Sequence, residues 1–220
     1  MLKKEIEKRV EEAQEKNTAF KVYSESDVFV SAGKEQFSVL DYWRFEFSNL
    51  VSLPSFYSIA EFLVAKAIGN TKAENSGYWT AYDMSYKNQR VEIKSSVYVH
   101  PWNKTRVSEV RSFSIEPTKN SYWSSEDKGY ERQNDLYVFC LNTNKEIDKV
   151  DPLNIDFWEF YVVPTFVINE YANPMQKSIS YRVVKRLSGG GVSYSGLKDK
   201  IDEAVDIIKS HYNEVEGKKL

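Results

Sequence analysis

Apolar residues at helical spacing mark several stretches of the chain. Residues 2–16 carry apolar side chains every three or four positions between charged ones, which predicts a peripheral amphipathic helix. Residues 55–68 repeat this spacing and end at Gly69, a residue suited to the position after a helix. A closing amphipathic helix is expected over 197–212. The aromatic-rich segment 37–51 is also predicted to be helical and buried.

A second group of segments has the pattern of β-strands. The runs 78–86 and 90–99 flank residues 87–89, which suit a turn, so the three together predict a hairpin. The continuous apolar run 136–141 is typical of a strand buried on both faces. A polar loop or an irregular helix is expected over 119–134. Further strands are expected over 111–116, 157–163 and 179–184.

The order of these elements predicts one domain of the α/β or α+β class. We expect residues 36–220 to form it, with residues 1–35 as an N-terminal helix and extension packed on the core. A length of 220 residues suits this organisation. Hydrophobic residues make up 41% of the chain and charged residues 28%, which excludes disorder across its whole length.

Several classes of protein do not fit the composition. No run of eighteen apolar residues exists, and the charged N-terminus has no apolar signal core, so we expect a cytoplasmic protein without a membrane span. One cysteine and two histidines exclude an internal disulfide and a cysteine- or histidine-rich zinc site. The net charge of −2 gives no overall sign of nucleic-acid binding, so any such signal must be local.

The segment 90–99 carries the candidate chemistry. Strand alternation places Glu92, Lys94 and Ser96 on one face and apolar side chains on the other. Pairing within the hairpin would bring Asp83 close to Glu92. Two neighbouring carboxylates repel each other unless a cation lies between them, and oxygen ligands of this kind suit Mg²⁺. A lysine two residues away can orient or help to deprotonate a water that attacks a phosphodiester.

Asp83 and the triplet Glu92-Ile93-Lys94, on a hairpin that follows a helix, resemble the PD-(D/E)xK nuclease superfamily. The resemblance implies a restriction-endonuclease-like central mixed β-sheet flanked by helices, and a Mg²⁺- or Mn²⁺-dependent endonuclease acting on DNA. Asp83, Glu92 and the Ile93 carbonyl would then bind the metal, and Lys94 would position the water. The resemblance also implies a further catalytic carboxylate, supplied by Glu61 from the preceding helix.

The similarity is closer still to a group of uncharacterised bacterial proteins within that superfamily. It is carried by the stretches 82–83, 91–98, 112–115 and 135–139, and it covers the chain from about residue 40 to the C-terminus. The chain departs from the superfamily pattern in having Tyr82, where a proline often stands before the first acid. The biological role of the group does not follow from these residues.

Competing explanations stay open for two residues. Glu61 matches a capping box begun by Ser58, but it would lie in the second turn if the helix begins nearer Ser55. Gln133 fits either a polar cap on the strand 136–141 or a place in the site.

DNA contacts would come from a locally basic stretch. Residues 87–111 hold six basic and two acidic side chains, and the same charges also suit a solvated loop. The candidates for contacting DNA are Ser96, Trp102, Lys104 and Arg106. A homodimer would suit the cleavage of two strands.

Two other functions also fit the sequence. One is a non-catalytic DNA-binding or assembly module that retains the nuclease fold. The other is a protein-interaction domain with an aromatic surface. For Asp83, Glu92 and Lys94, the structural alternative is an exposed hairpin face with a cross-strand ion pair, which contributes about 0.2–1 kcal/mol.

Overall fold

The computed structural model describes residues 23–70, 81–100, 105–110, 112–119 and 129–217. The chain divides into two compact units, residues 1–48 and 49–220, and each is described by itself. The helix expected over 2–16 lies outside the described residues. The expected domain boundary after residue 35 falls inside a strand of the first unit.

The first unit contains a β-hairpin followed by a helix. Strand β1 (Val28–Ser31) pairs antiparallel with β2 (Lys34–Ser38), and α2 (Val39–Phe47) follows directly. Ser38 caps this helix through a reciprocal capping box, in which its hydroxyl accepts the Asp41 N–H and the Asp41 carboxylate accepts the Ser38 N–H. These two bonds fix where the chain turns from strand to helix.

The prediction for residues 37–51 is correct for the helix but wrong for its burial. Within α2 only Val39 is buried, and Phe45 is 83% exposed. The physical reason is that a two-stranded hairpin and one short helix provide no second layer against which aromatic side chains can pack.

The second unit contains a mixed central sheet, which is what the resemblance implied. Its four strands lie in the order β3 (Met84–Tyr86), β4 (Gln89–Val97), β8 (Leu136–Asn142) and β9 (Trp158–Pro164). The β3–β4 and β8–β9 pairs are antiparallel, whereas β4 and β8 are parallel. Two small ladders accompany the sheet, formed by β5 (Ser112–Ser114) with β10 (Ser178–Ser180) and by β6 (Thr118–Lys119) with β7 (Tyr130–Glu131).

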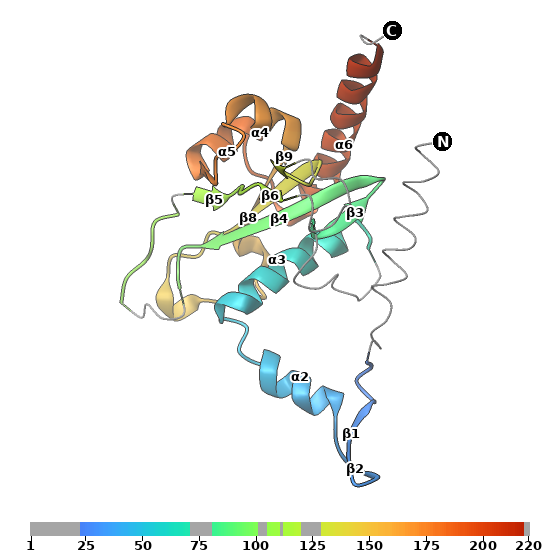
Figure 1. Cartoon of the computed structure of the whole chain (residues 1–220). Coiled ribbons are helices and arrows are strands. Elements are labelled where there is room, and N and C mark those ends of the chain that lie inside the picture. Colours follow the sequence, from blue (N-terminus) through green and yellow to red (C-terminus); the bar gives the residue numbers. More distant parts are fainter. Residues whose placement is uncertain (1–22, 71–80, 101–104, 111, 120–128, 218–220) are drawn as a thin grey trace, which may run out of the picture. The chain divides into compact units, whose positions relative to one another are not determined.

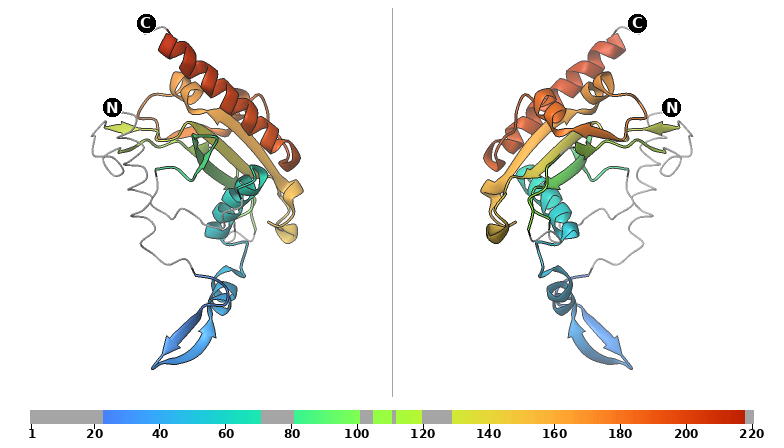
Figure 2. Two further views of the ribbon diagram at one scale, coloured as in Figure 1. Left: turned by 90° about the vertical axis from the view of Figure 1, so that its right-hand side faces the viewer. Right: turned by 90° about the vertical axis from the view of Figure 1, so that its left-hand side faces the viewer.

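Helices cover both faces of this sheet, as Figures 1 and 2 show. Helices α3 (Leu53–Ala67) and α6 (Tyr194–Gly217) lie on one face, and α4 (Thr165–Tyr171) and α5 (Tyr181–Leu187) lie on the other. Two 3₁₀ turns, η2 (Ile147–Lys149) and η3 (Ile155–Phe157), precede β9. No helix in the described part of the chain is long and apolar enough to span a membrane.

Strand β8 is buried along its whole length, which confirms the prediction of a strand covered on both faces. Its side chains alternate between two hydrophobic cores. Leu136, Val138 and Cys140 pack in the core under α3 and α6, and Tyr137, Phe139 and Leu141 pack in the core under α4 and α5. Strand β8 therefore contributes side chains to both hydrophobic cores.

The predicted hairpin is confirmed, with a tighter turn than expected. Lys87 and Asn88 alone form the turn, at φ angles of 47° and 66°, and Gln89 already belongs to β4. Positive φ at both central residues is the geometry that matches the twist of two paired strands, and asparagine tolerates it well. Ladder pairing begins only at Met84, and residues 78–80 of the predicted first strand lie outside the described residues.

Two further differences lie near the C-terminal end. The strand expected over 179–184 ends at Ser180, whose hydroxyl accepts the Val183 N–H and starts α5. A serine cap outweighs the β-branched residues that follow it. Helix α4 was not predicted, because Pro164 indicated only the end of a strand and the helix has seven residues.

The packing of β8 predicts where a small substitution destabilises the fold. Leu141 is 1% exposed and Leu153 is 67% exposed. Leu141→Ala should lower the free energy of unfolding by about 2–5 kcal/mol through lost burial and a cavity. Leu153→Ala, the control, should change it by less than about 0.5 kcal/mol. Urea denaturation of both variants measures this, and equal effects would contradict the assignment of β8 to the core.

Candidate active site

The hairpin places the predicted acids and lysine on one side of β4. Val91 and Ile93 pack in the core under α3 and α6, so Glu92 and Lys94 project from the opposite face. The Glu92 carboxylate and the Lys94 ammonium form an ion pair on that face. Both side chains keep contact with solvent, at 17% and 32% exposure respectively. The prediction that Glu92 and Lys94 share one face of the strand, with apolar side chains on the other, is therefore correct.

Asp83 is held at the edge of β4, just beyond the end of β3. Its backbone N–H donates to the Val91 carbonyl at 3.1 Å, and its carboxylate Oδ2 accepts the Ile93 N–H at 2.5 Å. The side chain thus takes the place of a strand partner for Ile93. In an antiparallel ladder the N–H and C=O of one residue point toward the same neighbour, so the Ile93 carbonyl also faces this edge.

Glu61 reaches the same region from α3. Burial, with repulsion from Asp83 and Glu92, raises its carboxyl pKa to about 7, and Lys94 acts in the opposite direction. The charges of Asp83, Lys94 and Glu92 all act on the Glu61 carboxyl, so the four groups are neighbours in space. The structure therefore brings together Glu61, Asp83, Glu92 and Lys94, all of which the sequence analysis singled out.

The capping-box explanation for Glu61 is wrong. Helix α3 begins at Leu53, and its cap is Ser52, whose hydroxyl accepts the Ser55 N–H at 3.4 Å. Ser58 instead donates its hydroxyl to the Pro54 carbonyl within the helix. Glu61 is thus well inside the helix, and its carboxylate is not needed to complete the N-terminus.

The carboxylates of this cluster resist ionisation. Burial raises the pKa of Asp83 and the pKa of Glu92, and Asp83 raises that of Glu92 further, although Lys94 partly offsets both. Burial alone would lower the pKa of Lys94, but the three surrounding carboxylates outweigh it and the pKa is raised. One ammonium thus neutralises part of a site that holds three acids, and a divalent cation would relieve the remaining repulsion.

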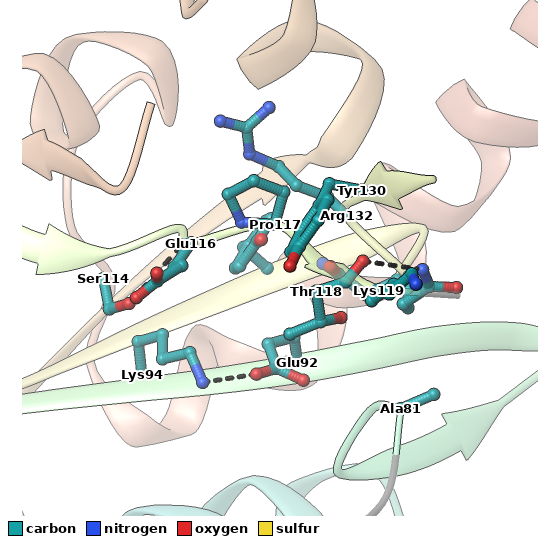
Figure 3. Close-up of a pocket in the computed structure, with 13 residues that line it drawn as sticks. Ala81, Glu92, Lys94, Ser114, Glu116, Pro117, Thr118, Lys119, Tyr130 and Arg132 are labelled. Atoms are coloured by element: carbon teal, nitrogen blue, oxygen red, sulfur yellow. Dashed lines mark hydrogen bonds and ion pairs between the residues drawn. The ribbon is translucent and has the colours of Figure 1, made fainter. Parts of the chain in front are cut away.

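Glu92 and Lys94 open into a cleft of about 600 Å³. In Figure 3 they rise from β4 on one side, and Pro117, Thr118 and Tyr130 lie on the other. Asp83 and Glu61 do not line the cleft, so Glu92 and Lys94 are the two members of the cluster that face it. Among the described residues, the cleft is also lined by Ala81, Ser114, Glu116, Lys119, Arg132, Gln133, Asn134 and Tyr137.

The far wall of the cleft is fixed by buried polar groups. The Arg132 guanidinium donates to the Ile115 carbonyl at 3.0 Å and to Asn169 Oδ1 at 2.8 Å, and burial lowers its pKa. Asn134 donates to Thr165 Oγ1 at 2.9 Å. These bonds join the loop before β8 to α4 and to the end of β5, which keeps the wall in place.

The lining residues that the sequence analysis missed include Tyr137 and Tyr130, and the role of Gln133 was left open. Tyr137 lies beside Glu92 in the parallel register of β4 and β8, and burial with the Glu92 charge raises the pKa of its phenol. Tyr130 belongs to a ladder of two residue pairs inside the segment expected to be a loop. Gln133 does line the cleft, which favours its place in the site. Only the pairing of strands far apart in sequence reveals these neighbours.

Of the four predicted DNA-contacting residues, the two that the structure describes do not line the cleft. Ser96 is half-buried on β4 and Arg106 is exposed, and neither lines it. Trp102 and Lys104 lie outside the described residues. Arg90 belongs to the basic stretch, but its guanidinium donates two hydrogen bonds, of 2.7 and 3.0 Å, to the Asp135 carboxylate. The expectation that this stretch contacts DNA through these side chains stays a prediction.

The donor set fits a hard divalent cation. Asp83 and Glu92 offer carboxylate oxygens, and the Ile93 carbonyl faces the same edge. Among the described residues, no three histidine, cysteine, aspartate or glutamate side chains meet closely enough to hold a metal by themselves. Mg²⁺ keeps several waters and uses only one or two protein carboxylates, so two acids and a carbonyl satisfy its needs.

No protein-family model, no curated protein and no solved structure matches this chain. The functional assignment therefore depends on the chemistry of the cluster and its cleft.

The raised pKa of Glu61 predicts a pH-dependent stability. Between about pH 4.5 and pH 7 the folded carboxyl keeps its proton while the unfolded one ionises, so stability without divalent ions falls as the pH rises. Glu61→Gln removes this contribution. The free energy of unfolding of the variant, relative to that of the wild type, should therefore rise from pH 5 to pH 8, by at most about 3 kcal/mol.

Urea denaturation at the two pH values in EDTA measures this difference. Glu203→Gln, at a position 57% exposed on α6, is the matched control. If the free energy of unfolding varies with pH in the same way for the wild type and Glu61→Gln, the pKa of the Glu61 carboxyl is not raised in the folded protein.

Proposed function

We propose that this chain is a divalent-metal-dependent deoxyribonuclease of the PD-(D/E)xK type. The observation that carries the proposal is the cluster of Glu61, Asp83, Glu92 and Lys94, three acids and one amine, of which Glu92 and Lys94 line a cleft. The topology adds support, because a helix precedes the hairpin that bears the acids and a parallel strand, β8, lies beside β4. This arrangement is the one expected of a restriction-endonuclease-like core.

The residues divide into those that hold the metal and those that act on water and phosphate. Asp83, Glu92 and the Ile93 carbonyl would bind Mg²⁺ or Mn²⁺. The ion would offset the negative charge that builds up on the phosphate and make a nearby water more acidic. The bond from the Ile93 N–H to Asp83 keeps that carboxylate at the edge of β4, where the two ligands can act together.

Lys94 and Glu61 have complementary proton chemistry. The raised pKa of Lys94 keeps its ammonium charged at neutral pH, so it donates hydrogen bonds and stabilises negative charge but does not remove a proton. Glu61, with a pKa of about 7, can accept a proton at neutral pH. We therefore assign the positioning of water and phosphate to Lys94, and proton acceptance to Glu61.

Cleavage assays with two single variants test the proposal. Purified protein should cut DNA in the presence of Mg²⁺ or Mn²⁺. Lys94→Ala and Asp83→Ala should each lower the rate by at least about 100-fold, because each removes a group that acts in the transition state. Lys149→Ala is the matched control, since Lys149 makes a similar ion pair with Glu146, at 2.6 Å on the surface, far from the cluster in sequence.

Unchanged cleavage by Lys94→Ala and Asp83→Ala would remove the assignment. A second function, a non-catalytic DNA-binding module with the same fold, is favoured by one feature: Glu92 and Lys94 already neutralise each other. DNA binding without any cleavage in either metal would support that module.

A further inference from the structure

The wall of the cleft opposite Glu92 and Lys94 carries an exposed aromatic ring beside a cation. Lys119 and Tyr130 are directly paired across the β6–β7 ladder, which places their side chains on the same face, and both line the cleft. Tyr130 is 55% exposed although it borders a cavity. Figure 3 shows it across the cleft from the Glu92–Lys94 pair. An open ring next to an ammonium offers a stacking surface for a base and a contact for its phosphate.

The size of the cleft limits what can enter it. A volume of about 600 Å³ is typical of pockets that take a small organic molecule, which is the scale of one nucleotide. Base pairs stacked in a duplex cannot present a single base to such a pocket without first unpairing it. A nucleotide that is already unpaired avoids that cost.

The cleft also contains polar groups suited to the edge of a base. Gln133 lines it and is only 7% exposed. Its amide nitrogen makes two long bonds, at 3.3 Å to the Thr118 carbonyl and 3.5 Å to the Glu131 carbonyl. Both bonds are longer than the usual range of about 2.7–3.2 Å for an N–H···O hydrogen bond, so they hold the amide weakly. Amide side chains can read the pairing edge of a base once it is unpaired.

The charges of the described lining residues favour stacking over electrostatic binding. Lys94 is paired with Glu92, and Arg132 donates to protein acceptors on the far wall. Duplex binding usually depends on many cations at phosphates, and the net charge of the chain is −2. We therefore expect affinity at this cleft to come from the Tyr130 ring together with Lys119.

We propose that the cleft binds one unpaired nucleotide, with its base on Tyr130 and its phosphate toward Lys119. The substrate is accordingly single-stranded DNA, or a single-stranded end, and not an intact duplex. This inference rests on the proposed nuclease function and names the substrate class of the same site. It adds Tyr130 as a residue that determines specificity.

The test is a binding measurement in EDTA, where cleavage does not interfere. Fluorescence anisotropy of a labelled oligothymidine and of a labelled duplex of equal length gives both affinities. The wild type should bind the single strand at least about 10-fold more tightly. Tyr130→Ala should weaken single-strand binding about 5- to 100-fold and leave duplex binding unchanged, whereas Tyr130→Phe should retain it. A thermal melt of each variant establishes that it is folded.

Tyr171→Ala is the matched control, because Tyr171 is 48% exposed on α4 and does not line the cleft. Equal affinity for single strand and duplex would overturn the inference, and so would a Tyr130→Ala variant that binds like the wild type. Preferred cleavage of intact duplex in Mg²⁺ would overturn it too, while leaving the nuclease assignment in place. Preferred single-strand binding that depends on Tyr130 supports the inference, and the absence of cleavage then counts only against the nuclease.

Discussion

The hydrogen bond from the Ile93 N–H to the Asp83 carboxylate is the interaction on which the site depends. Ladder pairing between β3 and β4 runs only from Met84 to Tyr86, so the edge of β4 beyond it would be left without a partner strand. Asp83 satisfies that edge with its side chain. The same bond places a carboxylate beside the strand that carries Glu92 and Lys94, so closing the hairpin also assembles the cluster.

Electrostatic repulsion within the cluster is the reason for proposing a cation site there. Glu61, Asp83 and Glu92 all have raised carboxyl pKa values, with burial as the largest cause, and a single ammonium lies among them. A purely structural arrangement would be more stable with fewer acids. The three acids nevertheless lie together at the edge of a sheet whose two cores are apolar. A divalent cation bound between them would be attracted by all three carboxylates and would offset their mutual repulsion.

Local patterns predicted those elements whose residues interact with near neighbours. Lys87 and Asn88 indicated the hairpin, the apolar run of β8 indicated a strand buried on both faces, and the strand alternation separated Glu92 and Lys94 from the core. The place of Tyr137 beside Glu92 depends on the parallel register of β4 and β8, and that of Tyr130 on a two-residue ladder. Such pairings are set by tertiary packing, so neither periodicity nor composition could indicate them.

Carbon-detected NMR titration of the Glu61 carboxyl, with and without Mg²⁺, tests the central claim most directly. In EDTA the carboxyl should titrate near pH 7, and saturating Mg²⁺ should move the titration well below that value, because the ion favours ionised acids around it. The same experiment on Asp83→Asn should show little response to Mg²⁺. A Glu61 carboxyl that titrates near pH 4.5 in EDTA, and does not respond to Mg²⁺, would contradict a shared cation site.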